Sequence, residues 1–181
     1  MNSASFTFHL TVGHLRRAIY YGFFIRNRKF LRVATYALGT IFFYFLMCAF
    51  GTFPMIAPLM FIAVGYLLWV VFMLVSLERQ VLGNVKDPSS FLHKGYEIKI
   101  SSELLQIAIP ESGAKLRVKP SNLYCAIEIS KIFLLYYSAE QVYILPKSIM
   151  RDGEENFVRN ILSDTLNERF YSHTIAKKGR G

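Results

Sequence analysis

The side chains that most often carry out chemistry are few and scattered in this chain. Neither cysteine is placed as a nucleophile, since Cys48 lies in a long apolar run and Cys125 in an alternating segment that predicts a small core side chain. The glycines form no phosphate loop, dinucleotide fingerprint or nucleophile elbow. No histidine stands at metal-ligand spacing from another histidine or a cysteine, at His9, His14, His93 or His173. The sequence therefore predicts no enzyme, no metal and no cofactor.

Charged residues near the end of the chain offer two further candidates. Asp152, Glu154 and Glu155 stand where the dipole of a following helix favours negative charge, so they indicate a solvated helix start rather than an acidic site. Lys147 follows Pro146 at the end of a strand-like segment. On a domain held at a membrane it could bind a lipid phosphate or an acidic group of a partner, and the alternative is a solvated turn residue. Three more cations would extend this candidate binding site if the fold brings them to one face, namely Arg117, Lys119 and Lys131.

Positions 33–77 form an apolar run without Asp, Glu, Lys, Arg or His. This run would hold the candidate binding cations at a membrane. One crossing of a bilayer takes about 20 apolar residues in a helix, so the run accommodates a hairpin of two spans, near 33–50 and 56–77. Gly51 and Pro54 mark the turn. A cleaved signal peptide would be shorter and nearer the start, and a buried helical hairpin would rarely lack charge over this length.

The distribution of basic residues predicts orientation. Segment 1–32 contains no acid and six basic residues. Because basic flanks of membrane spans are retained on the cytoplasmic side, both termini are expected on the cytoplasmic side of a bacterial inner membrane. The net charge of +9 gathers largely beside the spans, which favours anionic lipid head groups over nucleic acid as the partner. The six are Arg16, Arg17, Arg26, Arg28, Lys29 and Arg32.

Patterning divides the chain into a strand and basic amphipathic helix at 1–32, the hairpin at 33–77, a linker at 78–93, a β domain at 94–171 and a basic tail at 172–181. Residues 5–12 alternate as a half-buried strand that could join the later sheet. The helix after it would either lie on the membrane surface or pack on the soluble domain. Short alternating segments with turn signals predict six antiparallel strands, at 96–101, 104–109, 115–119, 123–130, 132–137 and 141–145. An amphipathic helix follows at 154–170.

The fold class expected is therefore α+β: a transmembrane helical hairpin plus a small antiparallel sheet or open barrel, capped by a C-terminal helix. This order of parts resembles the YcxB-like membrane proteins of bacteria. The resemblance rests on residues 95–101, the strand at 121–129 with Ile127-Glu128, Phe133-Leu134-Leu135-Tyr136 and Tyr143-Ile144-Leu145-Pro146-Lys147. Pro120 departs from the aromatic residue often found there. The resemblance implies a soluble part similar to pleckstrin-homology-like domains, and hence binding rather than catalysis.

Two functions remain open at this point. The first is a non-enzymatic, membrane-anchored binding or regulatory protein with a protein partner, for example an immunity protein against a membrane-acting toxin. The second is a two-span effector of antiphage defence that senses a cyclic nucleotide, multimerises and disrupts the membrane. A basic, aromatic pocket would favour the effector, and a filled core the first function. The oligomeric state stays open, because Thr35, Tyr36, Thr40 and Tyr44 could line an oligomeric pore. The alternative is that Tyr36 lies at the membrane interface and that the two threonines bond their own helix backbone.

Overall fold

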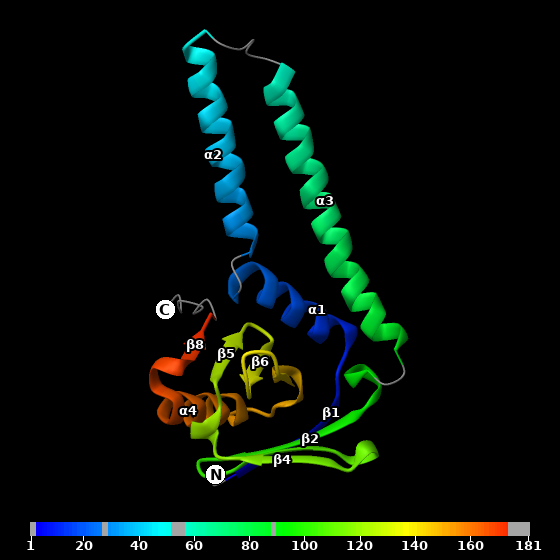
Figure 1. Cartoon of the computed structure of the whole chain (residues 1–181). Helices are drawn as coiled ribbons and strands as arrows, with labels where there is room; N and C mark the ends of the chain where they lie inside the picture. Colours follow the sequence, from blue (N-terminus) through cyan, green and yellow to red (C-terminus); the bar gives the residue numbers. More distant parts are fainter. Residues whose placement is uncertain (1–2, 27–28, 52–56, 88–89, 174–181) are drawn as a thin grey trace. The chain divides into compact units, whose positions relative to one another are not determined.

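The computed structural model describes residues 3–26, 29–51, 57–87 and 90–173 (Figure 1). These residues form two compact units. One unit combines Met1–Leu15 with Asp87–Gly181, and the other consists of Arg16–Lys86. The first unit is thus built from segments that flank the second in sequence.

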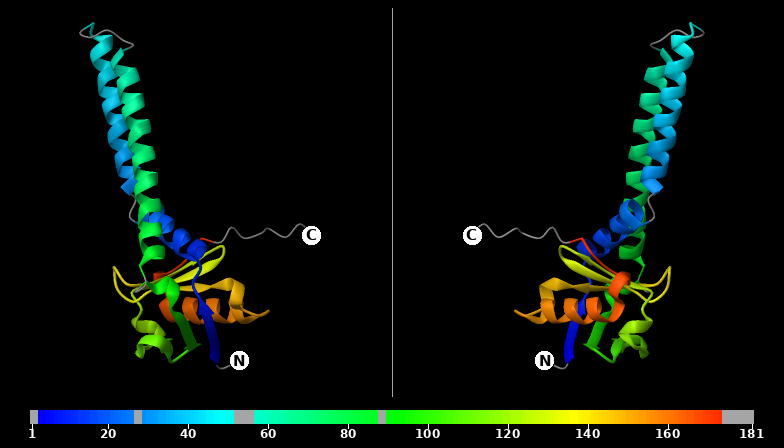
Figure 2. Two further views of the ribbon diagram at one scale, coloured as in Figure 1. Left: turned by 90° about the vertical axis from the view of Figure 1, so that its right-hand side faces the viewer. Right: turned by 90° about the vertical axis from the view of Figure 1, so that its left-hand side faces the viewer.

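The helical unit contains an antiparallel pair of long helices, α2 (Lys29–Ala49) and α3 (Ala57–Lys86), preceded by α1 (Val12–Tyr21) and a π-helical turn. Both long helices are long and apolar enough to cross a membrane, over Leu31–Ala49 and Ile62–Lys86. Helix α3 continues past the beginning of α2 (Figures 1 and 2). The expectation that a linker begins at residue 78 is therefore wrong, because helical hydrogen bonding extends through the polar residues up to Lys86.

The first sheet has four antiparallel strands in the order β1-β2-β3-β4. Strand β1 pairs along its whole length with β2, from Ser3 opposite Ser101 to His9 opposite Gly95. This confirms that the N-terminal segment is a strand and that it joins the sheet of the later domain. The four strands span Ser3–His9, Gly95–Ser101, Leu105–Ile109 and Ala114–Val118.

The second sheet also has four strands, in the order β7-β6-β5-β8. Strands β5, β6 and β7 are antiparallel neighbours, whereas β8 pairs in parallel with β5. The six strands expected after the hairpin, as a small sheet or open barrel, are present as β2–β7, but they divide between two sheets. Strand β8 was not expected: it starts at Phe170, where the predicted helix ends, and reaches Ser172, the first residue of the predicted tail. The strands span Cys125–Ile129, Ile132–Tyr136, Val142–Pro146 and Phe170–Ser172.

Helix α4 (Glu154–Leu166) lies alongside β5 and β8 (Figure 2). It ends in a 3-10 turn at Asn167–Arg169 that leads directly into β8. Its apolar stripe, with Val158, Leu162 and Leu166, is buried, as the amphipathic pattern predicts. The C-terminal helix is thus confirmed, although it is shorter than residues 154–170.

Apolar side chains fill the core of this β domain. One row crosses the first sheet from Phe6 through Ile98 to Ile107, and each of the three is at most 4% exposed. In the second sheet every residue of β6 is buried. Cys125 is also buried, in agreement with its prediction as a core residue.

Candidate functional site

The most unusual side chain of the β domain is Glu128, a carboxylate on β5 with no solvent exposure. Its neighbour across the sheet is Phe133, and the rest of β5 is apolar. An isolated buried carboxylate is costly, because it loses its hydration without compensation. Glu128 therefore needs partners from other elements of the domain.

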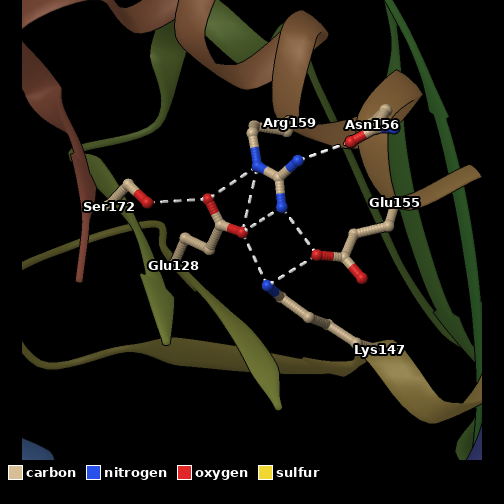
Figure 3. Close-up of polar contacts among 6 residues, drawn as sticks. All are labelled: Glu128, Lys147, Glu155, Asn156, Arg159 and Ser172. Carbon is tan, nitrogen blue, oxygen red and sulfur yellow. Dashed lines mark hydrogen bonds and ion pairs between the residues drawn. The ribbon is translucent and has the colours of Figure 1, made fainter. Parts of the chain in front are cut away.

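Three side chains donate hydrogen bonds to the Glu128 carboxylate (Figure 3). Arg159 donates from Nη2 to Oε1 at 2.6 Å and from Nε to Oε2 at 2.9 Å. Lys147 donates from Nζ to Oε1 at 2.6 Å, and the Oγ of Ser172 donates to Oε2 at 3.0 Å. Both carboxylate oxygens are thus satisfied by charge-assisted bonds.

A second carboxylate completes the arrangement. The Oε1 of Glu155 lies 2.9 Å from Lys147 Nζ and 2.6 Å from Arg159 Nη2, so it bridges both cations. Arg159 also donates from Nη1 to the side-chain oxygen of Asn156. We call Glu128, Lys147, Glu155 and Arg159 the Glu128 cluster; it contains two negative and two positive charges and is neutral (Figure 3).

The cluster draws on three parts of the domain, since Glu128 lies on β5, Lys147 follows β7, and α4 provides the other two; Ser172, which also bonds Glu128, lies on β8. Glu155 and Arg159 are four residues apart, so they share one face of the helix. Lys147 Nζ also lies 4.8 Å from the centre of the Phe133 ring, a cation–π contact on the face of the sheet that carries Glu128. The backbone adds a bond from His173 N–H to the carbonyl of Glu128, at 2.8 Å.

Electrostatics at Glu128 is a balance of opposed effects. Burial raises the pKa of its carboxyl group, but the hydrogen bonds from Arg159, Lys147 and Ser172 outweigh burial and bring the pKa to about 2. The same hydrogen bond stabilises the charged form of Arg159 and so raises the pKa of its guanidinium. Glu128 and Arg159 therefore stay ionised at neutral pH, and the bonds to Glu128 hold the ends of β7 and β8 against β5 and α4.

The structure places Lys147 differently from both sequence interpretations. Its side chain is 7% exposed, so it is not a solvated turn residue. Its ammonium group contacts Glu128 and Glu155 of the same chain, which leaves it poorly placed for a lipid phosphate or a partner. Glu155 lies in the first turn of α4 and its side chain is 40% exposed, as expected for a helix start, but it also bonds both cations of the cluster. Glu154 instead accepts a bond from the backbone N–H of Arg151, at 2.8 Å.

The other three predicted binding residues lie apart from the Glu128 cluster. Arg117 is on β4 and Lys119 directly follows that strand, whereas Lys131 lies in the turn between β5 and β6 of the other sheet. All three are exposed. Arg117 and Lys119, two residues apart in extended backbone, share a face of the first sheet, and Lys131 does not join them.

Five of the six basic residues predicted to lie at the membrane surface belong to α1, the π-helical turn and the start of α2. Arg16 forms an ion pair with Glu78 of α3 at 3.0 Å, and Tyr20 donates a hydrogen bond to the same carboxylate at 2.9 Å. This link between α1 and α3 was not anticipated. Arg17 and Arg32 are exposed and Arg26 is half-buried, while Arg28 and the side chain of Lys29 lie outside the described residues.

Two polar residues of α2 have local partners. Thr35 donates to the carbonyl of Leu31 and Thr40 to that of Tyr36, both at 2.9 Å. This confirms the interpretation in which the threonines bond within their own helix.

Glu128 itself was not identified as a functional residue from the sequence. The available signal was that Glu128 is the single acid in two consecutive strand segments that are otherwise mostly apolar. A carboxylate buried in such a segment is expected to pair with a cation from another part of the chain. Sequence could not say which cation, because Lys147 and Arg159 are 19 and 31 positions away. The short segments Ile127-Glu128 and Pro146-Lys147, which carry the YcxB-like resemblance, meet in this cluster.

The fold and the cluster define an α+β protein with two apolar helices of membrane-spanning length and a β domain organised around a buried ion network. Comparisons with protein-family models, with curated proteins and with solved structures found no match to this chain. The YcxB-like resemblance therefore remains a prediction.

Proposed function

We propose that this chain is a non-enzymatic, membrane-anchored binding protein of the YcxB-like kind, whose β domain recognises a protein partner at the cytoplasmic face of a bacterial inner membrane. A specific form of this function is an immunity protein that binds and blocks a membrane-acting toxin. Its helical hairpin inserts in the bilayer, and its basic flanks contact anionic lipid head groups.

The observation that carries this proposal is the pairing of β1 with β2. Strand β1 precedes the two apolar helices in sequence and β2 follows them, yet they pair over their full length. A hairpin of two crossings returns the chain to the side it left, so both strands can meet only on one side of the membrane. The basic residues before α2 favour the cytoplasm as that side.

The charged groups of the β domain support binding rather than catalysis. In the Glu128 cluster each charge faces an opposite charge of the same chain, so the cluster holds no acid, base or nucleophile available to a substrate. The row Phe6, Ile98 and Ile107 is occupied by large apolar side chains. This packing speaks for an outer surface as the recognition site, and against a nucleotide held inside the domain.

The location is tested by labelling a single cysteine. In a variant with Cys48→Ser and Cys125→Ala, Ser112→Cys places a thiol on the exposed turn before β4. A membrane-impermeant maleimide should label it in inverted membrane vesicles and not in intact spheroplasts. Labelling in intact spheroplasts would contradict the cytoplasmic location, and recovery of the protein in the soluble fraction would contradict the anchor.

The binding function is tested by purifying the intact protein from its host membranes and analysing what accompanies it by mass spectrometry. One stoichiometric protein should be recovered with the wild type and lost with Arg159→Ala, which disrupts the β domain but not the hairpin. Lys131→Ala, an exposed change in the same domain, is the matched control. Recovery of a cyclic nucleotide without a protein would contradict the proposal and favour the antiphage effector.

A further inference from the structure

The strand β4 is an outer strand of the first sheet, with β3 as its neighbour in the sheet order. An edge strand presents a row of unpaired backbone N–H and C=O groups on its free side, to which an extended peptide can add as a further strand. Apart from those with β3, none of the backbone hydrogen bonds found in the described part of the chain involves residues 114–118.

One face of this strand is basic. Lys115 and Arg117 alternate along it, Lys119 directly follows it, and all three are exposed. Their neighbours on β3 carry no charge, because Lys115 is opposite Ala108 and Arg117 is opposite Gln106. The one polar contact found there is a bond from Arg117 Nε to Gln106 Oε1, at 3.1 Å, which leaves the guanidinium charge uncompensated.

The opposite face of β4 is apolar and incompletely covered. Leu116 is in register with Ile107, and Val118 with Leu105. Those two β3 residues are 2% and 0% exposed, whereas Leu116 and Val118 are only half-buried. A further strand paired with β4 would place its own side chains beside Leu116 and Val118 and so bury more of their apolar surface.

The other edges of the two sheets lack this combination. Strand β1, at the far edge of the same sheet, exposes Ser3, Ser5, Thr7 and His9 and carries no Lys or Arg. At the edge formed by β7, the cation that follows the strand, Lys147, is already paired with the carboxylates of Glu128 and Glu155. At the edge formed by β8, Arg169 donates to the backbone carbonyls of Leu123 and Ser121.

We propose that β4, labelled in Figure 1, is the docking edge of this domain and that it binds an extended segment of a partner protein in which acidic and apolar residues alternate. The acids face Lys115, Arg117 and Lys119, and the apolar residues lie beside Leu116 and Val118. The same cations oppose pairing with a second copy of β4, because like charges would then face each other. A lipid head group would use the cations but neither the backbone edge nor the apolar margin, so a peptide strand fits better.

This inference rests on the proposed binding function and names the chemistry of its partner. The test uses the intact protein in nanodiscs of zwitterionic lipid and a short synthetic peptide that alternates glutamate and valine. Saturating peptide should slow amide hydrogen exchange in residues 114–118 at least about tenfold, the effect expected when exposed edge amides gain partners. The same peptide N-methylated on the amides that would face β4 keeps its charge but loses those backbone donors, and should give no protection.

Charge is tested by the double variant Lys115→Glu and Arg117→Glu, with Lys131→Glu as the matched control. The double variant should bind the glutamate peptide at least about tenfold more weakly and should gain binding to a lysine–valine peptide, a reversal that an unfolded domain would not show. Lys131→Glu should bind as the wild type does.

Three results with the peptide would overturn the docking edge. They are absence of protection in residues 114–118, equal binding of the N-methylated peptide, and displacement of the peptide from wild type by anionic lipid in the nanodisc, which would assign the basic face to lipid. A partner protein that still co-purifies with the Lys115→Glu and Arg117→Glu variant would leave the binding function in place while rejecting β4 as its site.

Discussion

The Glu128 cluster and the β4 edge use the same kinds of side chain in opposite surroundings. Lys147 and Arg159 face two carboxylates of their own chain, and Lys147 is almost fully buried. Lys115 and Arg117 face an alanine and a glutamine and remain exposed. A cation of this domain can therefore be an internal structural group, as Lys147 is, or remain exposed, as Lys115 and Arg117 are, and the presence of a facing carboxylate distinguishes the two.

This comparison predicts that the largest effect comes from the buried side. Arg159→Ala removes the forked contact with Glu128 and leaves a carboxylate short of partners in a dry environment, which should destabilise the β domain by about 3–5 kcal/mol. Amide exchange in β5 and α4 of the detergent-solubilised protein should accelerate accordingly, whereas Lys131→Ala should leave it nearly unchanged. Unchanged exchange in Arg159→Ala would mean that the cluster does not hold these elements together.

Removing both charges of one buried pair should cost less than the two single changes combined. Glu128→Gln and Lys147→Met each leave the other group without its partner, whereas the double variant leaves neither charge. We expect a coupling of about 1–3 kcal/mol in a double-mutant cycle, read from thermal unfolding by circular dichroism. Additive single effects would show that the two groups do not act as a pair.

The cluster should also give the domain a dependence on acid. The pKa of Glu128 is lowered from 4.5 to about 2 in the folded protein, so the unfolded chain binds the proton first as the pH falls. Its contribution to stability is complete above pH about 4.5 and is lost progressively towards pH about 2. The melting temperature should therefore fall more between pH 5 and pH 2.5 in the wild type than in Glu128→Gln, which controls for the other carboxylates; equal slopes would contradict the account.

On the exposed side, the effect on folding should be small and the effect on recognition large. The Lys115→Glu and Arg117→Glu variant changes two exposed residues, so each change should alter stability by about 0.5 kcal/mol or less. The melting temperature should stay close to that of the wild type while recovery of the partner falls. A large drop in melting temperature would show that these cations are structural, as Lys147 is.

The smallest effect is expected at the Arg16–Glu78 ion pair of the helical unit. Both side chains are partly exposed, at 52% and 36%, and such pairs contribute about 0–1 kcal/mol. Arg16→Ala should therefore change thermal unfolding only slightly, and increasing salt should reduce even that difference. Tyr20→Phe, which removes the second bond to Glu78, is the companion variant.

Local pattern predicted those parts of the fold whose signal is contained in a single segment. The uncharged run at 33–77 predicted two long apolar helices, and the alternation in residues 5–12 predicted a strand that joins the sheet. Strand β8 escaped prediction because three residues after a helix are too few to show a period. The division into two sheets escaped it because strand pairing is set by contacts distant in sequence.

The candidate site could be predicted only in fragments. Lys147 stood out by its position after Pro146, but its partner Glu128 lies in a different strand and Arg159 in a helix, so only the folded chain brings them together. Arg117 and Lys119 were expected to extend a binding site around Lys147, whereas the sheet order places them at the β4 edge of the other sheet. Sequence spacing alone could not distinguish an edge strand from a central one.

The most direct test of the central claim, that the β4 edge of a membrane-anchored domain recognises a protein, is site-specific photocrosslinking in the native host. A photoreactive amino acid is placed at Leu116 on β4 and, in a separate variant, at Lys131 in the turn of the second sheet. The account predicts one crosslinked protein from position 116 that is absent from position 131. No crosslink at 116, or the same product from both positions, would contradict it.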